Sequence, residues 1–328
     1  MLILTDSPCE TTRLLPEVCR GKPWNRQDVR EHADEGLWQT LGPGSAAYSL
    51  ESTGTSAAER FWSRLVLVAE APCSQFDLLL GRLAGQVREA GPVACLALQG
   101  RGFHGNRGRS WAALAGNLHL TAAIAPHLPT APYALSMSML PAVAVVDALT
   151  ATRCSVPGLG IKWVNDILIE GSKVAGVLTA TRVSGEMLGL VVFGIGINVA
   201  VAPEVPPTPF VPAVTCLRDI VKGDPPALSL LLWSLLDALA TRFDALRRQG
   251  TAGLFETYRR LSVVIGRRVR IWDEDAVFGQ DPAEWPPARV SGVVLDLGPD
   301  LCLRLDGQTD PVCRGRLAFE EACRDLGL

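Results

Sequence analysis

The apolar positions between about residue 61 and residue 261 fall into continuous runs separated by amphipathic segments. The runs RLVLVAEA and PVACLALQ predict buried strands, and residues 74 to about 89 between them predict an amphipathic helix. Residues 117–125 and 189–201 also have the pattern of strands. This alternation indicates an α/β (α+β) domain in which helices cover a mixed sheet.

Three further segments predict helices. Residues 140–152 are apolar with Asp147 on one face, and residues 228–249 carry an apolar stripe at 3.6-residue spacing that ends before Gly250. The shorter segment AGLFETYRRL follows. No charged residue occurs between Arg109 and Asp147, but prolines interrupt every window long enough to span a membrane, so we expect core there.

The pattern changes at both ends of this region. After Ser262, short alternating runs such as RRVRIW and ARVSGVVLDL predict a β-barrel of about 60 residues. Residues 1–60 are mixed, end in a stretch typical of a linker, and show no helix-turn-helix. We therefore expect an N-terminal extension of unknown role (1–60), a catalytic domain (61–260) and a C-terminal β-barrel (262–323).

Composition narrows the function classes. The chain has 328 residues, 48% of them hydrophobic, which is typical of a soluble globular enzyme. The net charge of -3 offers no summed positive field for nucleic acid. The N-terminus lacks the charge and apolar run of a signal peptide, and nine cysteines without a CxxC motif indicate reduced core thiols. We expect a cytoplasmic protein that binds neither nucleic acid nor membrane.

The segment LQGRGFHGNRGRSW, residues 98–111, is the most informative. Its glycines alternate with arginines and a histidine after a predicted strand, a combination that binds phosphate and carboxylate oxygens. Its GxGxxG lacks the helix start and the downstream acid of a dinucleotide site, and no P-loop occurs in the chain. Taken alone, the segment fits a solvated surface loop equally well.

Further motifs follow in order: RGRSW (107–111), GNL (116–118), KWVND (162–166), KVAGVL (173–178), GIGINV (194–199) and a weaker AVTCL (213–217). With them the chain resembles the biotin-protein ligase family. The resemblance implies a class II synthetase-like catalytic domain with a C-terminal SH3-like β-barrel. It also implies activation of biotin by ATP and Mg²⁺ to biotinyl-5'-AMP, and transfer to a lysine of a biotin carboxyl carrier domain.

Two alternatives stay open at this point. A lipoate or octanoate ligase or transferase shares the fold, and a non-catalytic relative would keep the fold while binding a ligand. The loop also departs from the family, because Phe103, His104 and Asn106 stand where arginines are expected. The sequence leaves open whether the chain forms a weak homodimer through its sheet edges.

The main predicted catalytic residues are cations that can offset negative charge. Joining a carboxylate to the α-phosphate of ATP brings negative charges together, so cations must stabilise the transition state. Lys162, inside an apolar stretch, and the loop residues Arg107 and Arg109 suit this role. The resemblance assigns Asp166 to orienting the acceptor lysine, although an Asn-Asp turn is the competing interpretation. Lys173 contacts phosphate or simply lies in the EGSK hairpin.

The candidate binding residues come partly from chemistry and partly from the resemblance. Gly194 and Gly196 on an apolar strand imply close approach of a backbone or a ligand, and Asn198 can hydrogen-bond a nucleotide. The resemblance places Gln99 against the biotin ureido ring; Trp111 would cover the ligand, and Ser74 is a helix N-cap. The full candidate binding set is Ser74, Gln99, Arg101, Gly105, Asn106, Gly108, Trp111, Gly116, Asn117, Lys162, Asn165, Lys173, Gly176, Gly194, Gly196 and Asn198.

Overall fold

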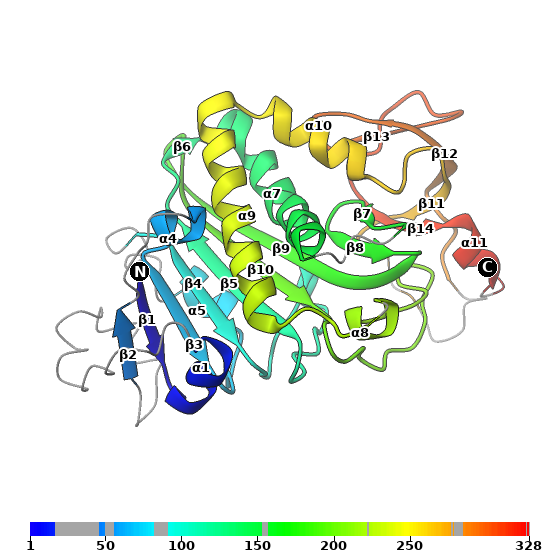
Figure 1. Ribbon diagram of the computed structural model, residues 1–328. Helices are drawn as coiled ribbons and strands as arrows, with labels where there is room; N and C mark the ends of the chain where they lie inside the picture. Colours follow the sequence, from blue (N-terminus) through cyan, green and yellow to red (C-terminus); the bar gives the residue numbers. More distant parts are fainter. Residues whose placement is uncertain are drawn as a thin grey trace.

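A large mixed sheet forms the centre of the computed structural model (Figure 1), which describes residues 1–16, 46–49, 56–81, 91–152, 157–221, 223–276, 278, 285–325 and 327. The strands run in the order β2-β1-β3-β4-β5-β10-β9-β8-β7, and β6 pairs with β10. The β1–β3 and β3–β4 pairs are parallel and the other pairs are antiparallel. The strands are β1 (Leu2–Thr5), β2 (Ala46–Ser49), β3 (Arg64–Val68), β4 (Val93–Ala97), β5 (Leu118–Ile124), β6 (Leu128–Pro129), β7 (Gly160–Lys162), β8 (Asp166–Ile169), β9 (Ser172–Ser184) and β10 (Met187–Ile197).

Helices cover the two faces unequally. On one face α7 (Thr130–Ala151) lies on β8, β9 and β10, and α9 (Leu228–Gln249) packs against α7 together with α10 (Ala252–Leu261) (Figure 1). On the other face the short α5 (Gln75–Gly81) contacts β5 and β10. Three short helices complete this part: α1 (Pro8–Leu14), α4 (Ala57–Phe61) and α8 (Leu217–Ile220).

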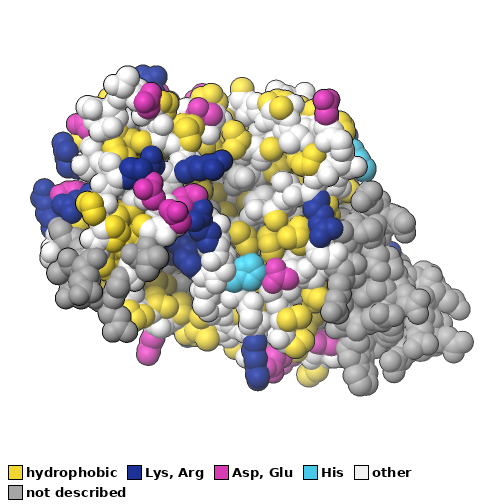
Figure 2. All heavy atoms as spheres, turned by 180° about the vertical axis from the view of Figure 1, so that it is seen from behind, with side chains coloured by type: hydrophobic (Ala, Val, Ile, Leu, Met, Phe, Trp, Pro, Cys, Tyr) yellow, Lys and Arg dark blue, Asp and Glu magenta, His cyan; other side chains and the backbone are white. Residues whose placement is uncertain are grey.

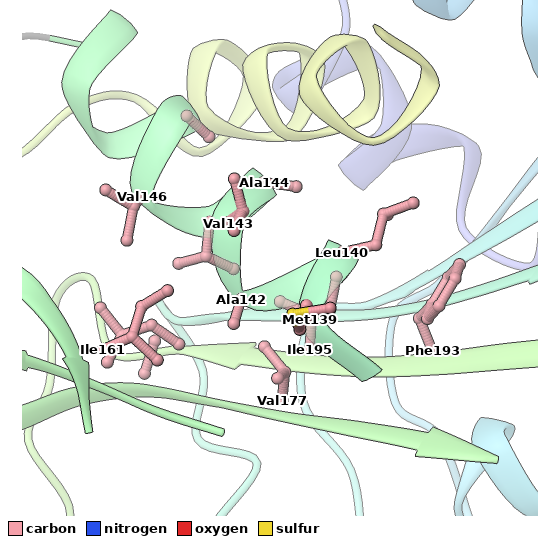
Figure 3. Packing of buried hydrophobic residues seen from close by; sticks show 14 of the residues in the cluster. Met139, Leu140, Ala142, Val143, Ala144, Val146, Ile161, Val177, Phe193 and Ile195 are labelled. Atoms are coloured by element: carbon pink, nitrogen blue, oxygen red, sulfur yellow. The ribbon is translucent and has the colours of Figure 1, made fainter. Parts of the chain in front are cut away.

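Strand alternation separates two apolar layers. Leu65 and Leu67 of β3 belong to the cluster beneath α7 and α9, whereas Val66 and Val68 belong to the smaller cluster beneath α5. Figure 3 shows the larger cluster, in which Ala142 and Val143 of α7 lie over the sheet. In the described part of the chain, α5 contacts mainly β5 and β10 on this face, which leaves room there for a binding site.

The predicted helices and strands are largely observed. The helix predicted at 228–249 is confirmed at both ends. Gly250, with φ 80°, terminates it. The predicted helix at 140–152 begins earlier, at Thr130, because Pro141 lies within the helix without ending it. By length and composition α7 could cross a membrane, but 67% of its most apolar window is buried inside the protein. The expectation that this region is core is therefore confirmed.

The N-terminal residues differ from the prediction of a separate extension. Strand β1 pairs in parallel with β3, Leu2 opposite Arg64, and antiparallel with β2. Residues 2–5 and 46–49 thus form one edge of the catalytic sheet, and 46–49 lie in the stretch that predicted a linker. The pairing joins segments about 60 residues apart, which local patterns do not reveal. Residues 17–45 lie outside the described part.

A four-stranded antiparallel sheet, in the order β13-β12-β11-β14, follows the catalytic domain. Its elements are β11 (Arg268–Trp272), β12 (Val290–Leu297), β13 (Leu303–Leu305), β14 (Arg316–Phe319) and the helix α11 (Glu320–Asp325). The predicted C-terminal β unit is therefore present, as an open sheet in the described pairings. It docks on the catalytic domain through Trp163, whose Nε1 donates to the carbonyl oxygen of Leu301 at 2.8 Å.

The cysteines depart from the prediction of reduced core thiols. Cys302 and Cys313 form a disulfide across the turn that follows β13. Cys9 and Cys73 are free but exposed, whereas Cys95, Cys216 and Cys323 are free and buried as expected. The cysteine spacing did not indicate the disulfide, because Cys302 and Cys313 are brought together by the backbone pairing of Leu303 with Val312. Cys19 and Cys154 lie outside the described residues, and the cytoplasmic location stays a prediction.

Candidate active site

The glycine-arginine segment folds as a β-hairpin with an exposed tip. Trp111 N donates to the Phe103 carbonyl at 2.9 Å, and Gly105 N donates to the Arg109 carbonyl at 2.7 Å. A single 3-10 turn, η2 (Asn106–Gly108), forms the tip, where Arg107 and Gly108 have positive φ. We call residues 103–111 the hairpin. Its backbone hydrogen bonds make it an ordered element, while residues 106–110 are exposed to solvent.

Beneath the hairpin lies a cavity of about 360 Å³ on the α5 face of the sheet. Alternate residues of β10 face it, with Gly194 and Gly196 on its floor, while Phe193 and Ile195 point into the helix-covered core. A Cβ atom on Gly196 would lie 2.2 Å from the Trp111 ring. Gly196 therefore closely approaches Trp111 of the hairpin, and Gly194 approaches Phe76 of α5, whose ring would lie 3.2 Å from an added Cβ.

A second, more polar cavity of about 300 Å³ adjoins the first. Four cationic residues line it: Arg107 and Arg109 from the hairpin, Lys162 from β7 and Arg316 from β14. Both cavities share Asn106, Arg109, Asn165, Asp166, Phe210 and Arg316 in their linings. On the face in Figure 2, Lys and Arg side chains gather with Asp and Glu beside a hollow lined by hydrophobic atoms.

Lys162 is the buried cation of the second cavity. It is 4% exposed, and Nζ donates to the carbonyl oxygen of Phe210 at 2.5 Å. Nζ also lies 5.5 Å from the Phe319 ring of the C-terminal sheet. Burial lowers the pKa of Lys162 to about 8, with Asp166 opposing this shift and Lys173 and Arg109 adding to it. Such a lysine favours an anionic partner.

Asp166 and Lys173 form an ion pair of 2.6 Å between neighbouring strands. Burial alone would raise the pKa of Asp166, but the fields of Lys173 and Lys162 outweigh it and lower the pKa. Lys173 Nζ also lies 5.7 Å from the Trp111 ring. The turn that precedes Lys173 has positive φ at Glu170 and Gly171, as in the predicted hairpin. Lys173 therefore both follows a hairpin turn and faces the cavity.

Other predicted residues lie where the sequence placed them. Ser74 is buried, lines the first cavity and accepts from Asp77 N at 3.4 Å, as an N-cap of α5 does. Asn165 donates to the Val177 carbonyl at 2.7 Å. Asn198 donates to the Thr215 carbonyl, while its buried Oδ1 has no hydrogen-bond partner among the described residues. Gly105, Asn106 and Gly176 also line the first cavity.

Two predicted binding residues lie outside both cavities. Gln99 is exposed and is absent from both cavity linings; it follows β4, which ends at Ala97. Arg101 is also absent from both linings, and its exposed guanidinium pairs with Glu70 at 3.3 Å.

The GNL segment has a structural role instead of the predicted contact with a ligand. The Oδ1 atom of Asn117 accepts from the backbone N–H groups of Val199, Ala200 and Val201 at 2.9, 3.0 and 3.1 Å. Its Nδ2 donates to the Val201 carbonyl at 2.8 Å. Gly116 and Gly108, both with positive φ, occupy turn positions outside both linings. Asn117 thus holds the segment that follows β10.

We expect Asn117→Ala to lower the free energy of unfolding by about 3 kcal/mol, because buried N–H groups lose their acceptor. Denaturant unfolding measures this change. Asn165→Ala is the matched comparison. It also removes a side-chain amide from the region, but it leaves no cluster of backbone N–H groups without an acceptor. An equal or smaller loss in Asn117→Ala would contradict the structural role.

The sequence missed several residues of the site. Arg316 lines both cavities and stacks on Phe210 at 3.9 Å. Burial, Arg109 and Arg107 lower its pKa to about 10. Phe76, His104 and His119 also line the first cavity. The single histidine of the glycine-arginine segment could have indicated that His104 belongs to the site. Arg316, in contrast, reaches the site only through docking of the C-terminal sheet.

Comparisons with known proteins agree with this geometry. Residues 89–198 match the model of the biotin/lipoate A/B protein ligase family. The chain is 29% identical over 259 residues to a biotin--[acetyl-CoA-carboxylase] ligase of Mycobacterium tuberculosis, covering 77% of this chain and 88% of that ligase. It is 38% identical over 115 residues to the Paracoccus denitrificans enzyme of that name, covering 35% of this chain and 48% of that protein.

A solved structure supports the fold. The biotin protein ligase of Aquifex aeolicus in complex with biotin and ATP superposes with a TM-score of 0.55 at 19% sequence identity. The alignment covers 78% of this chain and 98% of that chain. The α/β architecture predicted from the motifs is therefore confirmed.

Proposed function

Because residues 89–198 match the model of the biotin/lipoate A/B protein ligase family, we propose that this chain is a biotin-protein ligase. It uses ATP to convert biotin to biotinyl-5'-AMP and transfers the biotinyl group to a lysine of a biotin carboxyl carrier domain. The similar ligases of Paracoccus and Mycobacterium carry this activity in their names. A lipoate ligase is the alternative that the same family model includes.

The observation that carries the proposal is the junction of two unlike cavities. The first is lined by Gly194, Gly196 and the Trp111 ring and suits an apolar acid with a compact head. The second holds the cations, which suit phosphates. A carboxylate at the far end of the first cavity therefore meets a phosphate at the near end of the second.

The chemistry has two steps. A biotin carboxylate oxygen attacks the α-phosphorus of ATP, and the bond to the bridging oxygen breaks to release pyrophosphate. The acceptor amine then attacks the acyl carbon, loses a proton, and AMP leaves with the former carboxylate oxygen. In the first step Lys162, Arg107, Arg109 and Arg316 stabilise the growing negative charge. In the second step, Asp166 at the junction of the cavities is suited to orient the acceptor amine.

Magnesium fits this site as an ion carried by the phosphates. The carboxylates in the linings, Asp166 and Glu274, are already paired with Lys173 and Arg107. Mg²⁺ commonly keeps several waters and binds through substrate phosphates and one or two carboxylates, so Glu274 and Asp166 are its candidate protein ligands. When bound, it would offset phosphate charge and leave the positioning of both substrates to the protein.

The rate should depend on the charge of Lys162. Since burial lowers its pKa to about 8, the free enzyme loses this cation as pH rises through that value. We expect kcat/KM for ATP to fall above about pH 8, because this parameter reports the free enzyme. Lys162→Arg should remove the decline even if it lowers the rate. An unchanged profile in Lys162→Arg would contradict the assignment.

The proposal is tested by following transfer. The protein, ATP, Mg²⁺ and either biotin or lipoate are incubated with a purified biotin carboxyl carrier domain, whose mass is then measured. Biotin should add one biotinyl group, and replacing the acceptor lysine by Arg should abolish the addition. A lipoyl adduct without a biotinyl adduct would reject the biotin assignment.

A further inference from the structure

His104 of the hairpin contacts groups that can only accept hydrogen bonds. Its Nδ1 lies 3.1 Å from the Gly105 carbonyl oxygen, and its Nε2 lies 3.0 Å from each carboxylate oxygen of Asp77 on α5. A carbonyl and an ionised carboxylate have no proton to donate. Satisfying both contacts at once requires hydrogen on both ring nitrogens, so the surroundings of His104 favour its imidazolium form.

His119, the other histidine in this lining, has the opposite requirement. Its Nδ1 accepts from Trp111 Nε1 at 3.3 Å, so that nitrogen carries no proton, and its Nε2 donates to the Leu114 carbonyl at 3.0 Å. Burial lowers the pKa of His119, whereas the Gly105 carbonyl and then Asp77 raise the pKa of His104. The surroundings of the two histidines thus favour opposite charge states.

These contacts fasten the hairpin from two sides. On the inner side, Trp111 packs over Gly196 and donates to His119, whose ring lies 5.9 Å from that of Phe103. On the outer side, the His104–Asp77 pair ties the hairpin to α5. Side-chain exposure is 27% for His104 and 57% for Asp77, so solvent can exchange protons with the pair.

Resting on the proposed function, we propose that His104 and Asp77 form a protonation-dependent clasp that positions the hairpin over the biotin cavity before biotin binds. His104 is a positioning residue. When it loses its proton, His104 loses its ionic attraction to Asp77 and keeps a single N–H for Asp77 and the Gly105 carbonyl. The contact with α5 is then weaker, and more of the ordering of the hairpin must be supplied by the free energy of biotin binding. Affinity for biotin therefore falls as pH rises through the titration of His104.

Other charged groups around His104 do not explain such a dependence. The charged groups closest to His104 are Asp77 of α5 and the arginines 107 and 109 of the hairpin. Burial lowers the pKa of His119 of β5, which favours its neutral form. Lys162, with a pKa of about 8, lines the second cavity and not the first. Binding of biotin alone, without ATP, keeps the test away from the phosphate-binding site.

The test compares the full-length protein with the variants Asp77→Asn, His104→Gln and His104→Arg. NMR of ligand-free protein follows the four histidines, with His104 assigned by its loss in His104→Gln. We expect His104 to titrate above an ordinary histidine and Asp77→Asn to move its titration to lower pH. Backbone capping of α5 by Ser74 uses Asp77 N, so Asp77→Asn leaves it intact.

Biotin affinity is then measured by calorimetry across the same pH range. Below the His104 titration, Asp77→Asn and His104→Gln should bind biotin roughly 3- to 10-fold more weakly than wild type. The wild-type affinity should decline by a similar factor as pH rises. His104→Arg, whose charge persists, should remove the decline of affinity with pH, whatever its absolute affinity for biotin.

The outcomes separate the two proposals. Absence of biotin binding at every pH would reject the proposed function, while the ligand-free titration would still test the clasp. An ordinary His104 titration that Asp77→Asn leaves in place would overturn the clasp. So would wild-type affinity in Asp77→Asn, or the same decline with pH in His104→Arg as in wild type.

Discussion

Replacing Lys162 by Met should lower the rate of biotinyl-5'-AMP formation by about 100- to 1000-fold, because a buried cation facing the phosphates is lost. Lys162 is the most buried of the cations in the second cavity, so solvent screens it least. The loss should appear in kcat, with biotin affinity nearly unchanged. Biotin-dependent exchange of pyrophosphate into ATP measures it.

Arg101→Met is the matched comparison for Lys162→Met. It removes a cation from the segment preceding the hairpin, but Arg101 is exposed, pairs with Glu70 and lies outside both cavity linings. We expect its exchange rate to stay within about twofold of wild type. Thermal unfolding of both variants checks that they fold. Equal losses of rate in the two variants would show that Lys162 has no special role.

The second large effect is expected at Gly196. In Gly196→Ala the new Cβ would meet the Trp111 ring at 2.2 Å, so the ring must move into the cavity or lift the hairpin. Overpacking of this kind costs about 1–3 kcal/mol, which corresponds to roughly 5- to 150-fold in biotin affinity. Calorimetry with biotin measures the change.

Gly189→Ala on the same strand is the control for Gly196→Ala, because its Cβ would meet neighbouring atoms at 3.5 Å, an ordinary contact. Its affinity for biotin should equal that of wild type. A smaller side chain at position 111 should also relieve the clash. Trp111→Leu is therefore expected to lower biotin affinity less in the Gly196→Ala background than in wild type. Additive losses would contradict direct packing of Trp111 on Gly196.

Sequence patterns predicted the fold where the signals were local. The helix α9 has an apolar stripe and a terminal glycine, and both of its ends were predicted correctly. Strand β1 was missed, because its pairing with β3 depends on a contact between distant segments. The open C-terminal sheet was recognisable from short alternating runs, but its contribution of Arg316 to the site depends on docking.

The candidate site was predicted best where the chemistry restricted the residue. A lysine within an apolar stretch and glycines on a buried strand both implied a nearby partner, and Lys162 and Gly196 lie in the cavity linings. Motif position alone gave no side-chain direction. Asn117 therefore proved to bind backbone N–H groups, and Gln99 points to solvent. Such directions follow from where each strand ends and turns.

Formation of an acyl-adenylate tests the central claim most directly. The protein is incubated with ATP and Mg²⁺ and with biotin, lipoate or no acid, and the small-molecule products are identified by mass spectrometry. The account predicts biotinyl-5'-AMP and pyrophosphate with biotin, and their formation about 100- to 1000-fold more slowly in Lys162→Met. Absence of an adenylate with both acids, from protein that is folded, would contradict it.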